Sequence, residues 1–270
     1  MGLYVNTNVA SMNAQRNLMQ SQSRLGRNFA RLSSGLRINN AKDDAAGQGI
    51  AMRISAEIAS VGMASRNASD AQAMIDTADG AYQEIHNMLL RMKEIAVQAS
   101  TGTLNSADRT ALNAEVSALE KEITSISNNT TFGGISLGAG KEVVFQIGAA
   151  KGAALTHTFA AFKASDLGAD VAVDTTNGAT AALATLSTAI ATVSTRRGTL
   201  GALSNRLSST IANLDNISVN LSSARGRIQD TDFAQETSNL AKSQIMQQAA
   251  TAMLAQANAS KGTILTLIQG

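Results

Sequence analysis

The sequence predicts a mainly α-helical protein. We expect a long antiparallel helical, coiled-coil bundle with a small β-hairpin region in the middle, and termini that pair as a coiled coil on assembly. Apolar residues recur at alternating spacings of three and four over long stretches, which is typical of helices packed on partner helices. The 270 residues contain no proline, which would break such helices. Glycine and β-prone residues cluster between residues 132 and 179.

The composition excludes several classes of site. The chain has no cysteine, so it carries no disulfide and no thiolate metal site. Its two histidines lie far apart in sequence, so we predict no metal site and no cofactor. Six phenylalanines, two tyrosines and no tryptophan would make a thin core for a compact globule of this length. No apolar run approaches 18 residues, so we expect no membrane insertion, and the N-terminus lacks the apolar region of a secretory signal peptide.

Charge is unevenly distributed along the chain. Residues 1–42 contain six basic residues and no acidic one, whereas residues 43–130 contain twelve acidic and six basic residues. Residues 131–195 hold four acidic and three basic residues, and residues 196–270 hold four and seven. Nucleic-acid binding, an organelle transit peptide and self-assembly through the ends each explain basic termini.

The N-terminal segment is predicted to form an amphipathic helix over residues 3–34. Gly35 supplies a stop, because glycine tolerates the left-handed conformation just past a helix end. Asp43 or Asp44 can then cap the next helix. The apolar positions follow a heptad-like spacing of 7, 4, 3 and 4, and they are Leu18, Leu25, Phe29, Leu32 and Leu36.

The strongest signal is a helix from residue 44 to residue 100, about 85 Å long at 1.5 Å per residue. Its apolar series demands partner helices, and its many alanines allow close approach. A third helix over residues 106–128 follows a short connection and is therefore an antiparallel neighbour. The series in the long helix is Ile58, Val61, Ala64, Ala68, Ala71, Ile75, Ala78, Tyr82, Ile85, Leu89, Met92, Ala96 and Ala99.

Two β-prone runs, 143–147 and 155–159, predict a hairpin that needs the helices for support. Helix returns at about residue 180, and Asp230–Asp232 separates it from a last helix. We therefore divide the chain into five segments with the bounds 1–43, 44–131, 132–179, 180–229 and 230–270.

The terminal stripes are too long and too narrow to be buried within one small domain. We infer that they pair with each other and with other copies of the chain. The predicted assembly interface comprises Leu18, Leu25, Phe29, Leu32 and Leu36 from the N-terminal segment, and Leu240, Met246, Ala249, Met253 and Leu254 from the C-terminal segment.

Several motifs resemble bacterial flagellins. The N-terminal motifs are Asn6-Thr7-Asn8, Leu32-Ser33-Ser34-Gly35-Leu36-Arg37-Ile38-Asn39, Ala41-Lys42-Asp43-Asp44-Ala45-Ala46-Gly47 and Glu94-Ile95-Ala96-Val97-Gln98. The C-terminal motifs are Gln244-Ile245-Met246-Gln247-Gln248-Ala249 and Leu254-Ala255-Gln256-Ala257-Asn258. The resemblance covers residues 1–135 and 180–270. The chain departs from the family's pattern where Ala259-Ser260-Lys261 replaces a common proline, and it lacks the long variable outer domains.

The resemblance implies a structural subunit of the hollow flagellar filament, located outside the cell and used for swimming. The terminal helices would form the inner tube, and the other long helices the next shell. Implied partners are further copies of the chain, the flagellar type III export apparatus with its chaperone, and the cap and junction proteins. The alternatives are the hook–filament junction protein of the same superfamily and a secreted monomeric effector.

The resemblance also implies a recognition patch for the flagellin-sensing Toll-like receptor of animals, at Arg91, Ile95 and Glu115. Arg91 and Ile95 are four residues apart and should share one helix face. Protofilament contacts are the alternative role of the same patch.

Other functions are disfavoured by the residues themselves. Nucleic-acid binding would need aromatic platforms or a helix-turn-helix pattern, and residues 1–42 contain only Tyr4 and Phe29 as aromatics. A transit peptide would not have matching heptads at the other end of the chain. His86 and His157 have no acid or nucleophile partner nearby in sequence, so we expect no enzyme.

Overall fold

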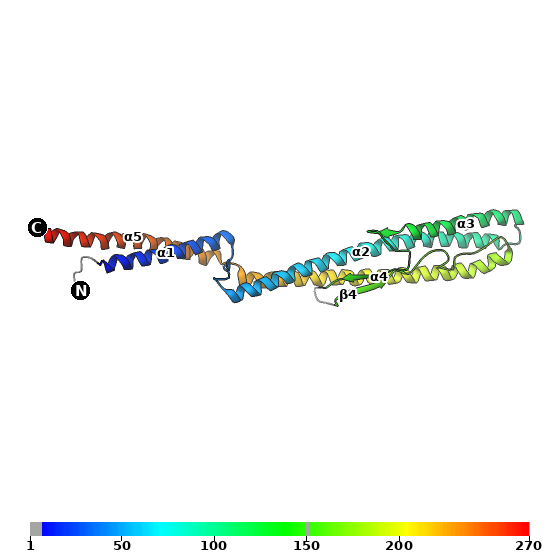
Figure 1. Cartoon of the computed structure of the whole chain (residues 1–270). Helices are drawn as coiled ribbons and strands as arrows, with labels where there is room; N and C mark the ends of the chain where they lie inside the picture. Colours follow the sequence, from blue (N-terminus) through cyan, green and yellow to red (C-terminus); the bar gives the residue numbers. More distant parts are fainter. Residues whose placement is uncertain (1–6, 149–151, 270) are drawn as a thin grey trace. The chain divides into compact units, whose positions relative to one another are not determined.

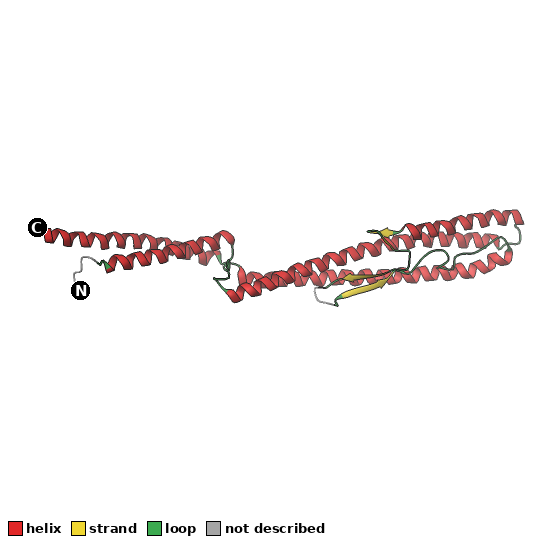
Figure 2. Ribbon diagram, viewed as in Figure 1, coloured by secondary structure: helices red, strands yellow, loops and turns green. Residues whose placement is uncertain are grey.

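The computed structural model describes residues 7–148 and 152–269, which are mainly helical (Figure 1, Figure 2). This confirms the predicted helical fold with a small central β region. The predicted start of the first helix at residue 3 lies outside the described residues. The helices are α1 Val9–Ser34, α2 Ala45–Ala99, α3 Ser106–Asn129, α4 Thr176–Gln229 and α5 Phe233–Gln269. The strands are β1 Thr131–Phe132, β2 Ile135–Ser136, β3 Glu142–Gln146 and β4 Ala154–Thr158.

The chain forms two compact units, which are described separately. The first unit consists of Met1–Ala56 and Asn220–Gly270, and the second of Glu57–Val219. The boundaries fall inside α2 and α4, so each of these two helices contributes to both units.

In the first unit, α1 and α5 lie side by side and run antiparallel (Figure 1). The side chain of Asn8 caps α1 by accepting a hydrogen bond from the Ser11 N–H at 3.1 Å. Gly35 ends the helix with a φ of 71°, a left-handed conformation that glycine adopts without strain. Asp232 caps α5 by accepting from the N–H groups of Ala234 and Gln235. Both helix starts therefore follow from side chains that satisfy otherwise unpaired backbone donors.

A short backbone clasp joins the end of α1 to the junction between α4 and α5. The Arg37 N–H donates to the Gln229 carbonyl at 2.7 Å, and the Thr231 N–H donates to the Gly35 carbonyl at 2.9 Å. The predicted cap of the next helix is Asp44, whose Oδ1 accepts from the Gly47 N–H at 2.9 Å.

The second unit is built around α2, and every predicted seam position from Val61 to Ala99 is buried. Ile58, next to the boundary between the units, is half-buried. Because many of these side chains are alanines, the helices pack closely while Ile85, Leu89 and Met92 fill the space where α3 and the middle segment add further layers. Residues from α3 and α4 complete the core, namely Val116 and Ile123, and Ala179, Ala182, Leu186, Ala189, Val193, Leu200 and Leu207.

By length and composition alone, helix α4 is long and apolar enough to cross a bilayer. The buried core helices of soluble proteins also meet these two criteria. Here α4 is tied to α2 by an ion pair. The Arg197 guanidinium donates through Nε and Nη2 to the two carboxylate oxygens of Asp79, at 2.8 and 3.1 Å. Such a bidentate pair fixes the relative position of the two helices as well as adding stability.

Two hairpins occupy the middle of the chain. β3 and β4 pair antiparallel, with Val144 opposite Thr156. Each strand begins and ends one residue earlier than the predicted run. The shorter hairpin of β1 and β2 turns through Gly133 and Gly134, whose φ values of 55° and 80° fit a tight two-residue turn. The sequence analysis missed this hairpin, although the Gly-Gly pair is a recognised signal for it.

The connection from β4 to α4 packs on the bundle, which periodicity did not predict. Phe159 and Phe162 are buried, and the Tyr82 hydroxyl donates to the Ala160 carbonyl at 3.1 Å. The N–H groups of Val171 and Val173 donate to side chains of α3, at Glu120 and Asn113. These bonds satisfy backbone donors that the surrounding core would otherwise leave without water.

Two neighbouring leucines of α2 differ in burial, so we expect their substitutions to differ in their effect on stability. Leu89 is fully buried, whereas Leu90 is 42% exposed. Leu89→Ala should lower the free energy of unfolding by about 2–5 kcal/mol, because it leaves a cavity. Leu90→Ala removes the same atoms and should cost about 1 kcal/mol or less. Urea denaturation followed by circular dichroism measures both, and equal losses would contradict the assigned packing.

Candidate self-assembly interface

The facing surfaces of α1 and α5 form a continuous seam, here called the terminal seam. Its residues are the best-buried positions of the two helices, and on both helices their spacing alternates between three and four. From α1 they are Ser11, Ala14, Leu18, Ser21, Leu25, Asn28 and Leu32; from α5 they are Glu236, Leu240, Ser243, Gln247, Ala250, Leu254 and Ala257. This is the heptad geometry of a coiled coil.

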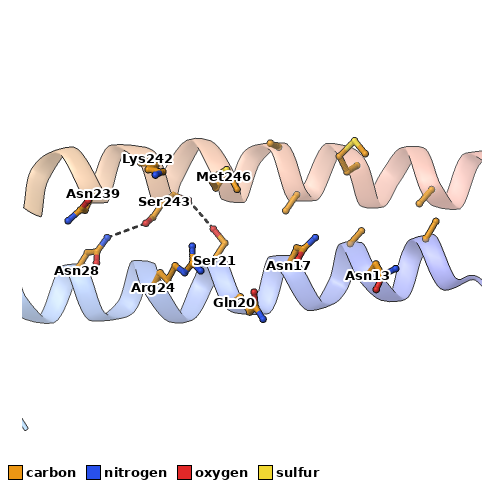
Figure 3. Close-up of a pocket in the computed structure, with 16 residues that line it drawn as sticks. Asn13, Asn17, Gln20, Ser21, Arg24, Asn28, Asn239, Lys242, Ser243 and Met246 are labelled. Atoms are coloured by element: carbon orange, nitrogen blue, oxygen red, sulfur yellow. Dashed lines mark hydrogen bonds between the residues drawn. The ribbon is translucent and has the colours of Figure 1, made fainter. Parts of the chain in front are cut away.

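Polar contacts cross the terminal seam. The Asn28 amide donates to the Ser243 hydroxyl at 3.2 Å, and the Ser21 hydroxyl donates to the Ser243 carbonyl at 3.1 Å (Figure 3). Near its ends, Asn8 donates to the Ala257 carbonyl and Arg31 lies 3.9 Å from the Glu236 carboxylate. Polar groups in a seam favour one alignment of the helices at a cost in stability.

The predicted interface residues divide into two sets. Leu18, Leu25, Leu32, Leu240 and Leu254 are half-buried in the terminal seam. The other five lie elsewhere: Leu36 is half-buried in the backbone clasp, where it pairs with Asp230, while Phe29, Met246, Ala249 and Met253 are exposed.

Phe29 corrects the sequence analysis, which placed it in the α1 stripe. It is 52% exposed, and its neighbour Asn28 occupies the seam position. Both residues fit between Leu25 and Leu32, because a spacing of three then four serves as well as four then three. In the structure Asn28 takes the seam position and donates a hydrogen bond to Ser243, and the larger apolar side chain is left outside.

A groove of about 680 Å³ runs beside the terminal seam (Figure 3). Its α1 wall is polar, with Asn13, Asn17 and Gln20, whereas its α5 wall carries Met246 and Met253. These two methionines are 53% and 65% exposed. Methionine is flexible and polarizable, and it is common on surfaces that adapt to a partner.

The exposed apolar surface of this unit extends beyond the groove. Val9, Met12 and Met19 on α1, and Ile245 on α5, are each more than 60% exposed. Repeated large apolar side chains on the outside of a helix pair indicate an interaction surface.

The predicted receptor patch is only partly at the surface of the second unit. The Arg91 guanidinium donates to Glu115 Oε1 from Nε and Nη2, at 2.9 and 2.8 Å, and to Glu94 Oε2 from Nη1 at 3.2 Å. These hydrogen bonds to the carboxylates, with the Glu115 bond first, raise the pKa of Arg91. The sequence analysis missed Glu94, although its spacing of three from Arg91 is a usual one for ion pairs in helices.

Ile95 does not share the exposed face of Arg91, contrary to expectation. It is fully buried, three residues after Met92 and four before Ala99 in the α2 core series. Two residues four apart lie on neighbouring parts of a helix surface. Here Ile95 lies inside the core of the second unit, whereas Arg91 lies outside it.

The two histidines do not form a catalytic arrangement. His86 is half-buried, and its Nδ1 atom has no hydrogen-bond partner among the described residues. His157 lies on β4 with its ring edge against Phe159, and burial lowers its pKa. In the described part of the chain, no group of three His, Asp or Glu side chains could hold a metal ion.

Long bundled helices, with an apolar surface left exposed on the paired terminal segments, define a helical protein that assembles with further copies. Comparison with known families identifies which one. Residues 5–142 match the bacterial flagellin N-terminal helical region, and residues 183–268 match the bacterial flagellin C-terminal helical region. The chain therefore belongs to the bacterial flagellin family and is a structural subunit of the flagellar filament.

Full-length relatives support this assignment. A flagellin of Halalkalibacterium halodurans is 40% identical over 273 residues, covering 99% of this chain and 100% of the relative. A flagellin of Bacillus subtilis is 38% identical over 302 residues, covering 98% and 99%. The crystal structure of Bacillus cereus flagellin has a TM-score of 0.50 at 30% identity, covering 55% of this chain and 88% of that one. The similar length of the first relative shows that the chain is a short form.

The burial of Ile95 gives a test at this patch. Ile95→Asp should lower the free energy of unfolding by several kcal/mol, because it places an unpaired charge in the core. Arg91→Ala breaks only an exposed ion pair and should cost about 1 kcal/mol or less. Chemical denaturation compares the two variants, and a stable Ile95→Asp protein would contradict the burial of this side chain.

Proposed function

We propose that the chain polymerises through its terminal helices. Segments 1–43 and 230–270 form the inner tube of the hollow filament, and segments 44–131 and 180–229 form the next shell. The hairpin segment 132–179 lies farther out. In this arrangement the terminal seam holds each subunit's own helices together, and the exposed side chains beside it contact other copies.

The observation that carries this proposal is the exposed apolar surface beside the terminal seam. Phe29, Met246 and Met253 each expose more than half of their surface in the single chain. Burying one such side chain fully is worth about 1.5–3 kcal/mol. Because a head-to-tail contact repeats without closing, the gain recurs at every subunit along the filament.

Membership of the family supports a proposal for the location and the accessory partners. We propose that the chain leaves the cell through the flagellar type III apparatus, with a chaperone, and meets the cap and junction proteins at the filament. The lack of disulfides and of proline suits a chain that passes through a narrow channel and then forms long helices. The role is structural, without an enzymatic step, a cofactor, nucleic acid or insertion into a membrane.

A second role concerns the outer helices. We propose that Arg91, with Glu115 and Glu94, contacts a neighbouring protofilament and offers a recognition surface to the animal Toll-like receptor. Ile95 would support this surface from below by fixing the packing of α2. The exposure of the three charged side chains favours this assignment.

Truncation tests the role of the terminal helices. Deleting residues 1–35 or 235–270 removes one half of the terminal seam and should abolish polymerisation. The helices between residues 44 and 225 should remain folded, because their core is buried within the second unit. Electron microscopy with seeds measures filament formation and circular dichroism measures helix content; normal filaments from either truncated chain would refute the proposal.

Charge substitutions separate the seam from the outer surface. Leu32→Asp should weaken the pairing of α1 with α5, whereas Phe29→Asp should leave that pairing intact and block contacts between copies. Both should reduce filament yield and swimming, since desolvating a charge costs several kcal/mol. Gln22→Asp, at an exposed position that does not line the groove, is the matched control. Wild-type swimming of the Phe29→Asp strain would exclude Phe29 from the interface.

A further inference from the structure

The first unit contains a second cavity, which is lined by three basic side chains, whereas the groove beside the terminal seam is lined by two, Arg24 and Lys242. The second cavity has a volume of about 620 Å³, and it lies between the outer surface of α1 and the connector that follows the backbone clasp. We call it the basic cavity. Its polar lining comprises Ser23, Arg27, Arg31, Asn39, Asn40 and Lys42, together with the carboxylate of Asp43.

The one carboxylate in this lining is already engaged. Asp43 Oδ2 accepts hydrogen bonds from the N–H groups of Asn39 and Asn40, at 3.3 and 3.0 Å. The Asn40 bond is the main cause that lowers the pKa of Asp43. Asp43 thus shapes the connector. Because Arg31 lies 3.9 Å from the Glu236 carboxylate, the cations of the basic cavity without an ion pair in the described chain are Arg27 and Lys42.

Donors in the basic cavity remain free. The side chains of Asn39, Asn40 and Lys42 make no hydrogen bond or ion pair with the rest of the described chain. The Arg27 guanidinium is held by one bond, from Nη1 to the Ser23 hydroxyl at 2.9 Å, so its other N–H groups are available. These free donors surround a space suited to an oxyanion.

Two small residues of α1, Gly26 and Ala30, also line the basic cavity. A Cβ atom added at Gly26 would meet nothing within 4 Å. No side chain therefore covers the backbone of α1 at this point of the cavity.

The long helix α2 carries the matching charge. Its carboxylates at Glu57, Asp70, Asp76 and Glu84 are exposed and form no ion pair within the described residues. Since flagellins polymerise, another copy of the chain brings these carboxylates to the surface of a subunit.

We propose that the basic cavity of one subunit receives exposed carboxylates of α2 from a second copy. This inference rests on the proposed polymerisation and names one electrostatic contact within it. Complementary charges chiefly speed association and fix alignment, and salt weakens them. The cavity thus guides each incoming subunit, while the exposed apolar side chains beside the terminal seam supply contact area.

A charge swap tests the contact in the full chain. The double variant Arg27→Glu/Lys42→Glu should slow elongation from wild-type seeds by roughly tenfold or more at low salt. Light scattering and electron microscopy measure the rate at low and high NaCl. The double variant is then combined with one reversal on α2 at a time: Glu57→Lys, Asp70→Lys, Asp76→Lys or Glu84→Lys.

At least one combination should restore the elongation rate, and the wild-type rate should fall as NaCl rises. The control Arg16→Glu/Arg53→Glu makes the same charge change at exposed positions outside the cavity, and it should retain the wild-type elongation rate.

An unchanged elongation rate for the cavity variant, an equal loss in the control, or no rescue by any reversal would overturn the inference. Failure of the wild-type chain to elongate would instead refute the proposed polymerisation. Circular dichroism confirms that each variant is folded.

Discussion

Close packing of helices through small residues in a three–four repeat is the constraint on which the structure depends. In the second unit, alanines at Ala64, Ala68 and Ala71 let the helices approach, and larger residues farther along α2 fill the core beneath α3. Such a core needs few aromatic side chains, which explains how a chain with eight of them folds at all. The absence of proline has the same origin, because one proline within α2 or α4 would interrupt this packing.

The two units use this repeat differently. The second unit closes its seam with apolar residues and covers it with α3 and the middle segment, so it is complete as a single chain. The terminal seam instead contains Ser21, Asn28 and Ser243, and it leaves Phe29 and Met246 outside. A pair of helices with several polar residues in its seam and large apolar side chains left exposed can gain further stability from neighbours. Assembly is therefore built into the distribution of side chains, and not added to a finished fold.

The sequence was sufficient to predict features that repeat, and insufficient for those set by single contacts. Every α2 seam position from Val61 to Ala99 was predicted, because each follows its neighbour by three or four residues. Phe29 was misplaced because Asn28 and Phe29 fit the spacing between Leu25 and Leu32 equally well, and hydropathy favoured the phenylalanine. Ile95 was misplaced because a helical spacing of four does not say where the core ends. The burial of Phe159 and Phe162 has no periodic pattern, since irregular backbone is held there by individual bonds from the side chains of Tyr82 on α2 and Arg196 on α4.

The central claim is that the terminal seam is internal to each subunit, whereas the stripe beside it faces other copies. A helical reconstruction of the assembled filament by electron cryomicroscopy tests this most directly, at a resolution that shows side chains. The account predicts that Leu25 and Leu32 contact the α5 helix of their own chain, while Phe29, Met246 and Met253 are covered by neighbouring subunits. A filament in which Met246 and Met253 remain exposed to solvent would contradict it.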